Sequence, residues 1–244
     1  GYYSFGNRTV EYKTYYYNCA SGGDITELSS WSTKPYGDGI NPSSFDLDYA
    51  TWIIQCDAEI TKDLAITGSN TNIVLQGSGL PNSSRTPTLT ISGGKTEFVS
   101  FKVNSPTISE HAQPSHVVVG SGADLTVYET LSLGTAESSI TNNGTMNVYV
   151  EEFSFYDSWV KNNGTMNFRN CDLTIHSNNQ QSNAYTIGYE SSSTVGHFIN
   201  NGTVDMTNSG LTVKDRFTQL YNGDGAVWKI DNTTSAIKKT ILFD

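Results

Sequence analysis

Charged side chains are scarce in this sequence, and basic ones are scarcer than acidic ones. Only 16% of the residues are charged, and 14 Lys and Arg against 24 Asp and Glu give a formal net charge of −10. Nucleic-acid binding needs clustered Lys and Arg to neutralise phosphates, and no such cluster is present. The same deficit disfavours an anionic membrane surface. We therefore expect no nucleic-acid partner.

Long apolar runs are also missing. No run of 18 or more apolar residues occurs, so the sequence holds no candidate transmembrane helix. The chain does not open with a charged segment followed by an apolar one, as a secretory signal peptide would. We expect a mature, processed extracellular protein, or a piece of one, that does not insert into a membrane.

Fingerprints of catalysis and cofactor binding are absent as well. The sequence lacks Gly-x-Ser-x-Gly, P-loop and Rossmann patterns, and its four histidines do not have a zinc-site spacing. A β-helical polysaccharide lyase or hydrolase would need clustered carboxylates with a basic partner. No Arg, Lys or His recurs beside the acidic candidates, which are Asp46/Asp48, Asp57/Glu59, Glu151/Glu152 and Asp157. We expect no enzyme, no cofactor and no metal, and keep a carbohydrate-active enzyme as an alternative.

What is present is a repeat. Asn-Asn-Gly-Thr-Met-Asn-Val at 142–148 returns as Asn-Asn-Gly-Thr-Met-Asn-Phe at 162–168 and as Asn-Asn-Gly-Thr-Val-Asp-Met at 200–206. The glycines are separated by 164 − 144 = 20 and 202 − 164 = 38 residues. The second step is either two repeats or one repeat with a long insertion. A period near 20 is typical of solenoids.

Within each copy of the repeat, apolar and polar residues alternate, which is the period-2 pattern of a β-strand. Stacking the copies as parallel strands places Met146, Met166 and Val204 in one interior column. The asparagines tolerate corner conformations and bond to copies of themselves, so they predict a ladder at the corners, formed by Asn143, Asn163 and Asn201. The sequence therefore predicts an all-β fold, a parallel β-helix with rungs of about 20 residues.

Two regions follow from this pattern. Residues 1–56 are rich in tyrosine, tryptophan and turn signals, and predict an N-terminal strand with an irregular aromatic cap over the end of the solenoid. Residues 57–244 predict the β-helix, with a polar loop or an oversized rung near 170–199. A leucine-rich repeat would need a helical segment that is absent, and propeller blades would need about 40 residues.

Three cysteines allow at most one disulfide. Cys19 and Cys56 flank the segment outside the repeat and form the pair most easily joined, which would stabilise the closed loop. Cys171 lies in a repeat strand and is interpreted as a small buried hydrophobic residue.

Six Asn-x-Ser/Thr triplets are candidates for glycosylation. They begin at Asn7, Asn82, Asn143, Asn163, Asn201 and Asn232. Three of the six belong to the repeat, and for these turn chemistry is the favoured explanation.

The cap carries a resemblance to a known group. The residues Leu28-x-x-Trp31, followed by Gly37-x-Gly39-x-x-Pro42-x-x-Phe45, resemble the N-terminal region of large surface proteins exported by bacteria that use type IX secretion. The resemblance implies an extracellular, adhesin-like or matrix protein with a β-helix. Those proteins usually end in a globular sorting domain, which 238–244 does not resemble, so we expect a processed C-terminus or a fragment.

The favoured functional hypothesis is a non-enzymatic extracellular structural subunit whose copies assemble head to tail into a surface filament or rod. The N-terminal strand region of one copy would cover the last rung of the next. The residues predicted to make this contact are Tyr2, Tyr3, Phe5, Val10, Tyr12, Ile241, Leu242 and Phe243. The alternative is an adhesin segment that binds surface glycans through its polar ladders and its aromatics, among them Trp31 and Tyr15 to Tyr17.

Overall fold

The chain is almost entirely β-structure arranged in long parallel sheets. The computed structural model describes residues 2–5, 8–77, 86–103, 114–134, 138–176, 197–214, 218–231, 234–237 and 241–243, and of their side chains those between Val10 and Asp231. Within these ranges there is no α-helix, and the one 3₁₀ turn is η1 (Leu28–Ser30).

The strands form three stacks, and two long strands, β10 (Lys95–Val103) and β12 (Asp124–Leu133), bend from the first stack into the second. Stack 1 holds the first halves of β10 and β12 with β7 (Leu64–Ile66), β14 (Thr145–Val148), β17 (Thr165–Arg169), β20 (Thr203–Thr207) and β23 (Val227–Asp231). Stack 2 holds their second halves with β3 (Lys13–Tyr17), β5 (Ala50–Ile54), β8 (Asn72–Leu75), β15 (Glu152–Tyr156), β18 (Asp172–His176), β21 (Gly210–Val213) and β24 (Thr234–Ile237). Stack 3 holds β6 (Ala58–Ile60), β9 (Thr88–Ile91), β11 (His116–Val119), β13 (Ser139–Asn142), β16 (Trp159–Asn162), β19 (His197–Asn200), β22 (Gln219–Asn222) and β25 (Ile241–Phe243).

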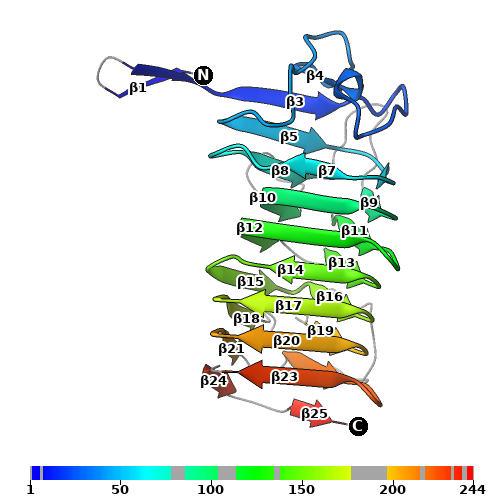
Figure 1. Ribbon diagram of the computed structural model, residues 1–244, viewed down its shortest axis with the longest axis vertical. Coiled ribbons are helices and arrows are strands. Elements are labelled where there is room, and N and C mark those ends of the chain that lie inside the picture. Colours follow the sequence, from blue (N-terminus) through cyan, green and yellow to red (C-terminus); the bar gives the residue numbers. More distant parts are fainter. Residues whose placement is uncertain are drawn as a thin grey trace.

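From β13 onward the chain visits stacks 3, 1 and 2 in turn, so every third strand pairs in parallel (Figure 1). This order is compatible with an all-β solenoid. The strand pairing also shows whether the 38-residue step from Gly164 to Gly202 is one turn or two. Val160 lies beside Phe198, and 198 − 160 = 38, so the interval is one turn with an insertion and not two turns. The interval from Ile140 to its neighbour Val160 is 160 − 140 = 20 residues and carries none.

Strand alternation builds the core. In β14 and β17 every second side chain is buried, and Met146 pairs with Met166, which pairs with Val204. All three are fully buried in the cluster between the stacks. The column continues upward to Leu125, so the apolar residues of successive turns lie one above another.

The parallel pairing begins before the predicted boundary at residue 56. β3 pairs with β5, and β5 pairs with β8, although β3 and β5 both lie within 1–56. β4 (Trp31–Ser32) runs antiparallel to the end of β3. The hairpin of β1 (Tyr2–Phe5) and β2 (Arg8–Glu11) projects sideways from this end of the stacks (Figure 1).

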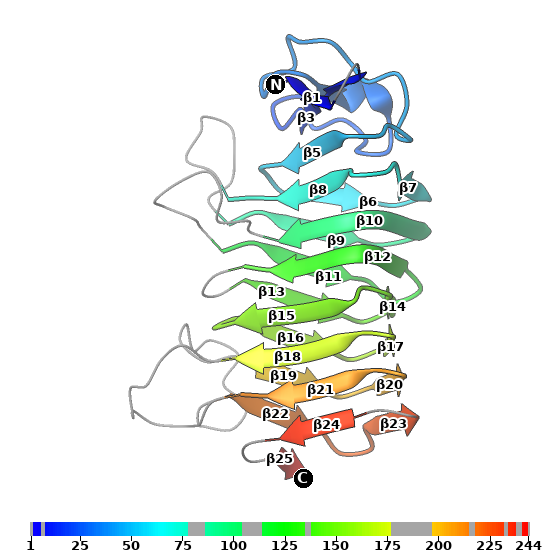
Figure 2. The ribbon, with the colours of Figure 1, turned by 90° about the vertical axis from the view of Figure 1, so that its left-hand side faces the viewer.

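At the other end, the last strands have a partner on one side only within the described residues. β23 pairs with β20, β24 with β21, and β25 with β22 (Figure 2). Ile230 is in register with the fully buried Met206 of the turn above, yet 56% of Ile230 is exposed. The neighbouring interior column, formed by Phe168, Met206 and Ile230, therefore reaches solvent at this end.

Candidate functional site

The N-terminal end of the core is closed by aromatic rings. Trp31 and Trp52 are fully buried and meet edge to face at 5.1 Å, and Tyr15 and Phe45 lie 5.0 and 5.2 Å from Trp52. The indole Nε1 of Trp31 donates a hydrogen bond to the carbonyl oxygen of Ile25 at 2.8 Å. Such pairs stabilise beyond the area that they bury. This end is therefore closed, unlike the end at Ile230.

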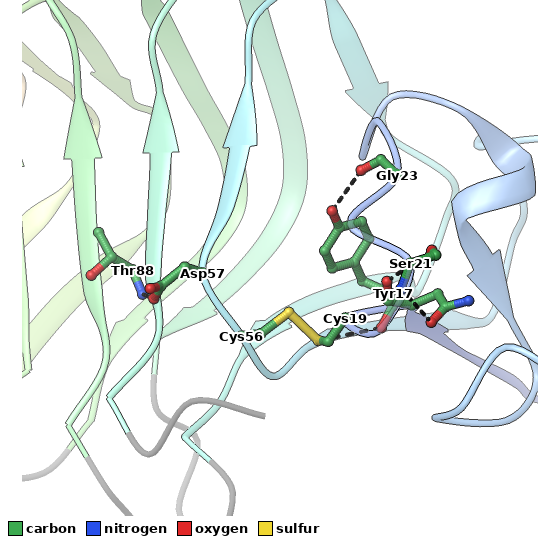
Figure 3. The surroundings of a disulfide bond; sticks show 8 residues. Tyr17, Cys19, Ser21, Gly23, Cys56, Asp57 and Thr88 are labelled. Atoms are coloured by element: carbon green, nitrogen blue, oxygen red, sulfur yellow. Dashed lines mark hydrogen bonds between the residues drawn. A yellow bond between two sulfur atoms is a disulfide. The ribbon is translucent and has the colours of Figure 1, made fainter. Parts of the chain in front are cut away.

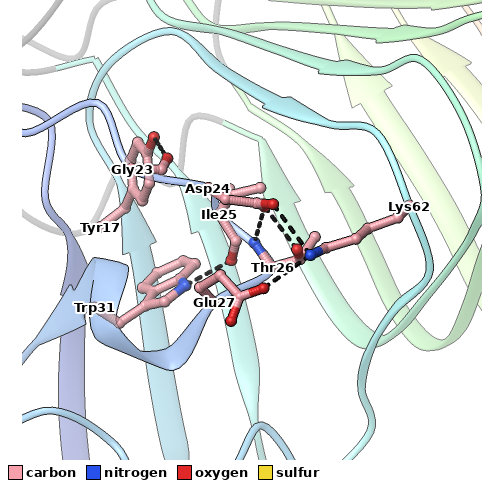
Figure 4. Close-up of polar contacts among 8 residues, drawn as sticks. All are labelled: Tyr17, Gly23, Asp24, Ile25, Thr26, Glu27, Trp31 and Lys62. Atoms are coloured by element: carbon pink, nitrogen blue, oxygen red, sulfur yellow. Dashed lines mark hydrogen bonds and ion pairs between the residues drawn. The ribbon is translucent and has the colours of Figure 1, made fainter.

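A polar cluster fastens the cap to the stacks (Figure 4). Lys62 Nζ lies 2.8 Å from Glu27 and 3.2 Å from Asp24. A hydrogen bond from Thr26 lowers the pKa of Asp24, and the bond to Glu27 raises the pKa of Lys62. Burial, with the charge of Asp24 second, raises the pKa of Tyr17, whose hydroxyl donates to a backbone carbonyl oxygen. Asp24 and Glu27 lie in the cap, and Lys62 lies between β6 and β7, so these ion pairs link the cap to the stacks.

Cys19 and Cys56 form a disulfide, the pair expected from the sequence (Figure 3). It ties the segment after β3 to the segment after β5, across a separation of 37 residues. Cys171 is a free, fully buried thiol. Burial, and secondarily the charge of Asp172, raises the pKa of Cys171 to about 12, so it remains protonated at neutral pH.

The repeat contains an inner asparagine ladder that sequence reasoning missed. Its members are Asn142, Asn162, Asn200 and Asn222. The side-chain amides of the first three each donate to the Oδ1 of the next, at 2.8, 2.9 and 2.9 Å, and Asn222 Nδ2 donates to the carbonyl oxygen of Ala226. The first three side chains are fully buried, and their Nδ2 atoms also donate to backbone carbonyl oxygens of the following turn. The first Asn of each doublet therefore satisfies the buried backbone where the chain turns from stack 3 to stack 1.

The predicted ladder of Asn143, Asn163 and Asn201 lies outside this inner one and is exposed. Asn163 Nδ2 donates to Asn143 Oδ1 at 2.8 Å, and Asn201 Nδ2 donates to Asn163 Oδ1 at 3.0 Å. The sequon nitrogens of Asn163 and Asn201 are thus engaged in the ladder. The other three predicted glycosylation sites, Asn7, Asn82 and Asn232, lie outside the described residues.

The residues predicted for self-assembly lie at both ends of the stacks. Val10 is half-buried, and Tyr12 is 43% exposed with its ring 5.3 Å from that of Tyr49. For Tyr2, Tyr3 and Phe5 only the hairpin backbone is described. The backbone of Ile241, Leu242 and Phe243 pairs with Leu220, Tyr221 and Asn222.

The residues of the glycan-binding alternative do not form an exposed platform. Tyr15, Tyr17 and Trp31 are 4%, 6% and 0% exposed, because they pack into the cap. Among the acidic candidates, Asp48 and Asp57 accept backbone N–H groups from Ser69 and Thr88, at 2.7 and 2.9 Å. These two carboxylates act as acceptors between neighbouring turns.

Comparisons with known proteins identify no relative. No family model matches the chain, and no match is found among curated proteins or solved structures. In the described part of the chain no helix is long and apolar enough to cross a membrane, and no group of His, Cys, Asp and Glu is arranged to hold a metal ion. Functional conclusions therefore rest on the geometry above.

Proposed function

We propose that this chain is a parallel β-helix that serves as a non-enzymatic extracellular structural subunit and assembles head to tail. Three stacks visited in cyclic order, with buried columns and asparagine ladders in register, support the β-helix. The disulfide is consistent with an oxidising, extracellular location. Surface export by type IX secretion, suggested by the Leu28 to Phe45 resemblance, is part of this proposal.

The contrast between the two ends carries the assembly proposal. Rings of Trp31 and Trp52 close the core at one end, whereas Ile230 is 56% exposed at the other. An exposed strand edge with apolar side chains is a template for another chain. The β1–β2 hairpin supplies strands that project from the closed end (Figure 1). The hairpin of one copy covers β23, β24 and β25 of the next, and this contact repeats without closing.

Sedimentation velocity of the full chain over a concentration series tests the proposal. The wild-type chain grows beyond its mass of 26.6 kDa as concentration rises. An Ile230→Lys variant stays monomeric, because it puts a charge on the exposed edge, and deletion of residues 1–11 has the same effect by removing the hairpin. Ile40→Lys is the matched control, because Ile40 is 76% exposed and lies in neither contacting segment. A wild-type chain that remains monomeric at every concentration would refute assembly.

A further inference from the structure

Two exposed tyrosines occupy equivalent positions in successive turns, at the corner between stacks 1 and 2. Tyr128 follows Val127, and Tyr149 follows Val148, the in-register partner of Val127. The tyrosines are 37% and 42% exposed, and their ring centroids are 6.0 Å apart. Two neighbouring, partly exposed aromatic rings offer faces on which a ligand can pack.

The ring of Tyr128 is held in place from the turn above. Its hydroxyl donates a hydrogen bond to Glu97, and Lys95 Nζ lies 3.0 Å from the same carboxylate. The position of this ring is therefore set before a ligand arrives, which lowers the entropic cost of binding. The hydroxyl of Tyr149 has no hydrogen-bond partner within the described residues.

A column of amides and hydroxyls runs beside the two rings. Each of three successive strands contributes one residue to this column, two positions before the corner: Thr126, Asn147 and Asn167. Two positions along a strand correspond to roughly 7 Å between the column and the corner residues. Asn167 Nδ2 donates to Asn147 Oδ1 at 2.8 Å, and Asn147 Nδ2 donates to Thr126 Oγ1 at 3.2 Å. We call these three residues with Tyr128 and Tyr149 the tyrosine strip.

The strip lies in the middle of a sheet, which limits what can bind there. β14 pairs with β12 on one side and with β17 on the other. A peptide therefore cannot add as a strand, because no sheet edge is available. A ligand of the strip must be recognised by aromatic faces, amides and hydroxyls.

Charge narrows the ligand class further. Glu97 is paired with Lys95, and Asp205, next to Asn167 in the column, is paired with Arg169 at 2.9 Å. Asp124 accepts a hydrogen bond from Asn147 Nδ2 at 2.9 Å and is in register with Lys95 of the neighbouring turn. These partners leave the three carboxylates poor attractants for a cation, while the net charge of −10 disfavours an anionic polymer. A neutral ligand with both apolar faces and hydroxyl groups fits these constraints.

We propose that the tyrosine strip binds a neutral glycan chain lying along the axis of the stacks. The C–H faces of sugar rings pack on Tyr128 and Tyr149, and their hydroxyls exchange hydrogen bonds with the half-buried Asn147 and Asn167. Thr126 is 3% exposed, so it does not reach the ligand and instead accepts the hydrogen bond that orients Asn147. The strip is on the side of the stacks, so end-to-end assembly leaves it accessible and repeats it along a filament, which adds avidity.

Affinity electrophoresis of the full chain tests this site. Native gels would contain laminarin, dextran or hydroxyethylcellulose as neutral polymers, and polygalacturonate as an anionic polymer. We expect retardation by at least one neutral polymer and none by polygalacturonate. Replacing Tyr149 by Ala weakens binding about fivefold or more, the effect of removing one aromatic contact.

Tyr156→Ala is the matched control, because Tyr156 is 44% exposed and also stacks on a neighbouring ring, that of His176 at 4.2 Å. It lies on stack 2, outside the strip, and its loss leaves affinity unchanged. The same gels are run with the Ile230→Lys variant, which is expected to stay monomeric. Its binding shows whether the strip binds a glycan without assembly. No retardation by any neutral polymer, binding to polygalacturonate alone, or an equal loss in Tyr156→Ala would each overturn the proposal.

Discussion

At the residue scale, two neighbouring asparagines in one motif perform different tasks. Asn162 is fully buried, donates to Asn200 Oδ1 and to the carbonyl oxygen of Thr203, both at 2.9 Å, and accepts from Asn142. Asn163 is exposed and bonds only to the outer ladder. Water can replace the outer bonds but cannot reach the inner ones.

This contrast predicts unequal costs of truncation. Asn162→Ala should lower the free energy of unfolding by about 2–3 kcal/mol, because it leaves buried polar groups without partners. Asn163→Ala should cost under about 1 kcal/mol, since its neighbours remain solvated. Urea denaturation of both variants measures the difference. Equal losses would show that the inner ladder is not a buried network.

Gly164 is needed for close approach between turns. A Cβ at this position would lie 2.1 Å from the backbone oxygen of Gly144, and one at Gly202 would meet Gly164 at the same distance. Gly164→Ala should therefore destabilise by ~1–3 kcal/mol or prevent folding, because backbone must shift. Gly122→Ser is the control, since its Cβ would meet nothing within 4 Å and only its φ of +84° opposes a side chain. Thermal denaturation should give the larger loss for Gly164→Ala.

The phenol of Tyr128 should titrate late. The hydrogen bond to Glu97, then burial and the charge of Glu97, raise the pKa of Tyr128 to about 12. Because this pKa lies above the unfolded value of about 10, the stabilisation is complete below pH 10 and is lost as pH rises towards 12. Ultraviolet titration of Glu97→Gln should show one tyrosine returning to an ordinary pKa. An unchanged tyrosine titration would contradict the Glu97 contact.

At the element scale, the disulfide joins the two earliest strands of stack 2. Its separation of 37 residues predicts that reduction costs about 3–4 kcal/mol through the freed unfolded chain. Guanidinium unfolding with and without reductant measures the loss. Cys171→Ala retains the disulfide and is the control for thiol effects. If reductant leaves the free energy of unfolding unchanged, the packing of Trp31 and its neighbours stabilises the cap without a contribution from the disulfide.

The sequence pattern predicts the strands within one repeat better than it predicts which strands of other repeats they pair with. Alternation around Met146 and Met166 predicts their shared column, because strand side chains face opposite ways in turn. The long step to Gly202 stayed ambiguous, because spacing alone does not say which strands pair. Only the register of Val160 with Phe198 decides it. β3 and β5 were assigned to the cap for the same reason, since their composition does not reveal the parallel partners that they find.

The candidate sites, too, could be predicted from the sequence only in part. The inner ladder was missed because buried asparagine violates the usual expectation for a polar residue. Its fourth member, Asn222, is in register with Asn200 but is followed by Gly223 where the other copies have their second Asn, so the doublet pattern does not reveal it. The tyrosine strip was also missed. Tyr128 and Tyr149 each follow the Val that ends an alternating strand segment, 149 − 128 = 21 residues apart. The spacing was available in the sequence, but only the corner geometry shows that both rings are exposed and adjacent.

At the scale of the whole molecule, the two ends are unlike. The cap closes one end with aromatic rings, and the other leaves Ile230 exposed on strands that pair on one side within the described residues. A head-to-tail contact between unlike ends, as proposed above, repeats in one direction and does not close into a dimer. The unequal ends therefore support a filament more than a symmetric pair.

Electron microscopy of the concentrated full chain distinguishes a head-to-tail filament from separate rods. Head-to-tail assembly predicts filaments of one rod width, in which the strand spacing of about 4.8 Å continues through the contacts between subunits. Separate rods of single-subunit length at every concentration would contradict it.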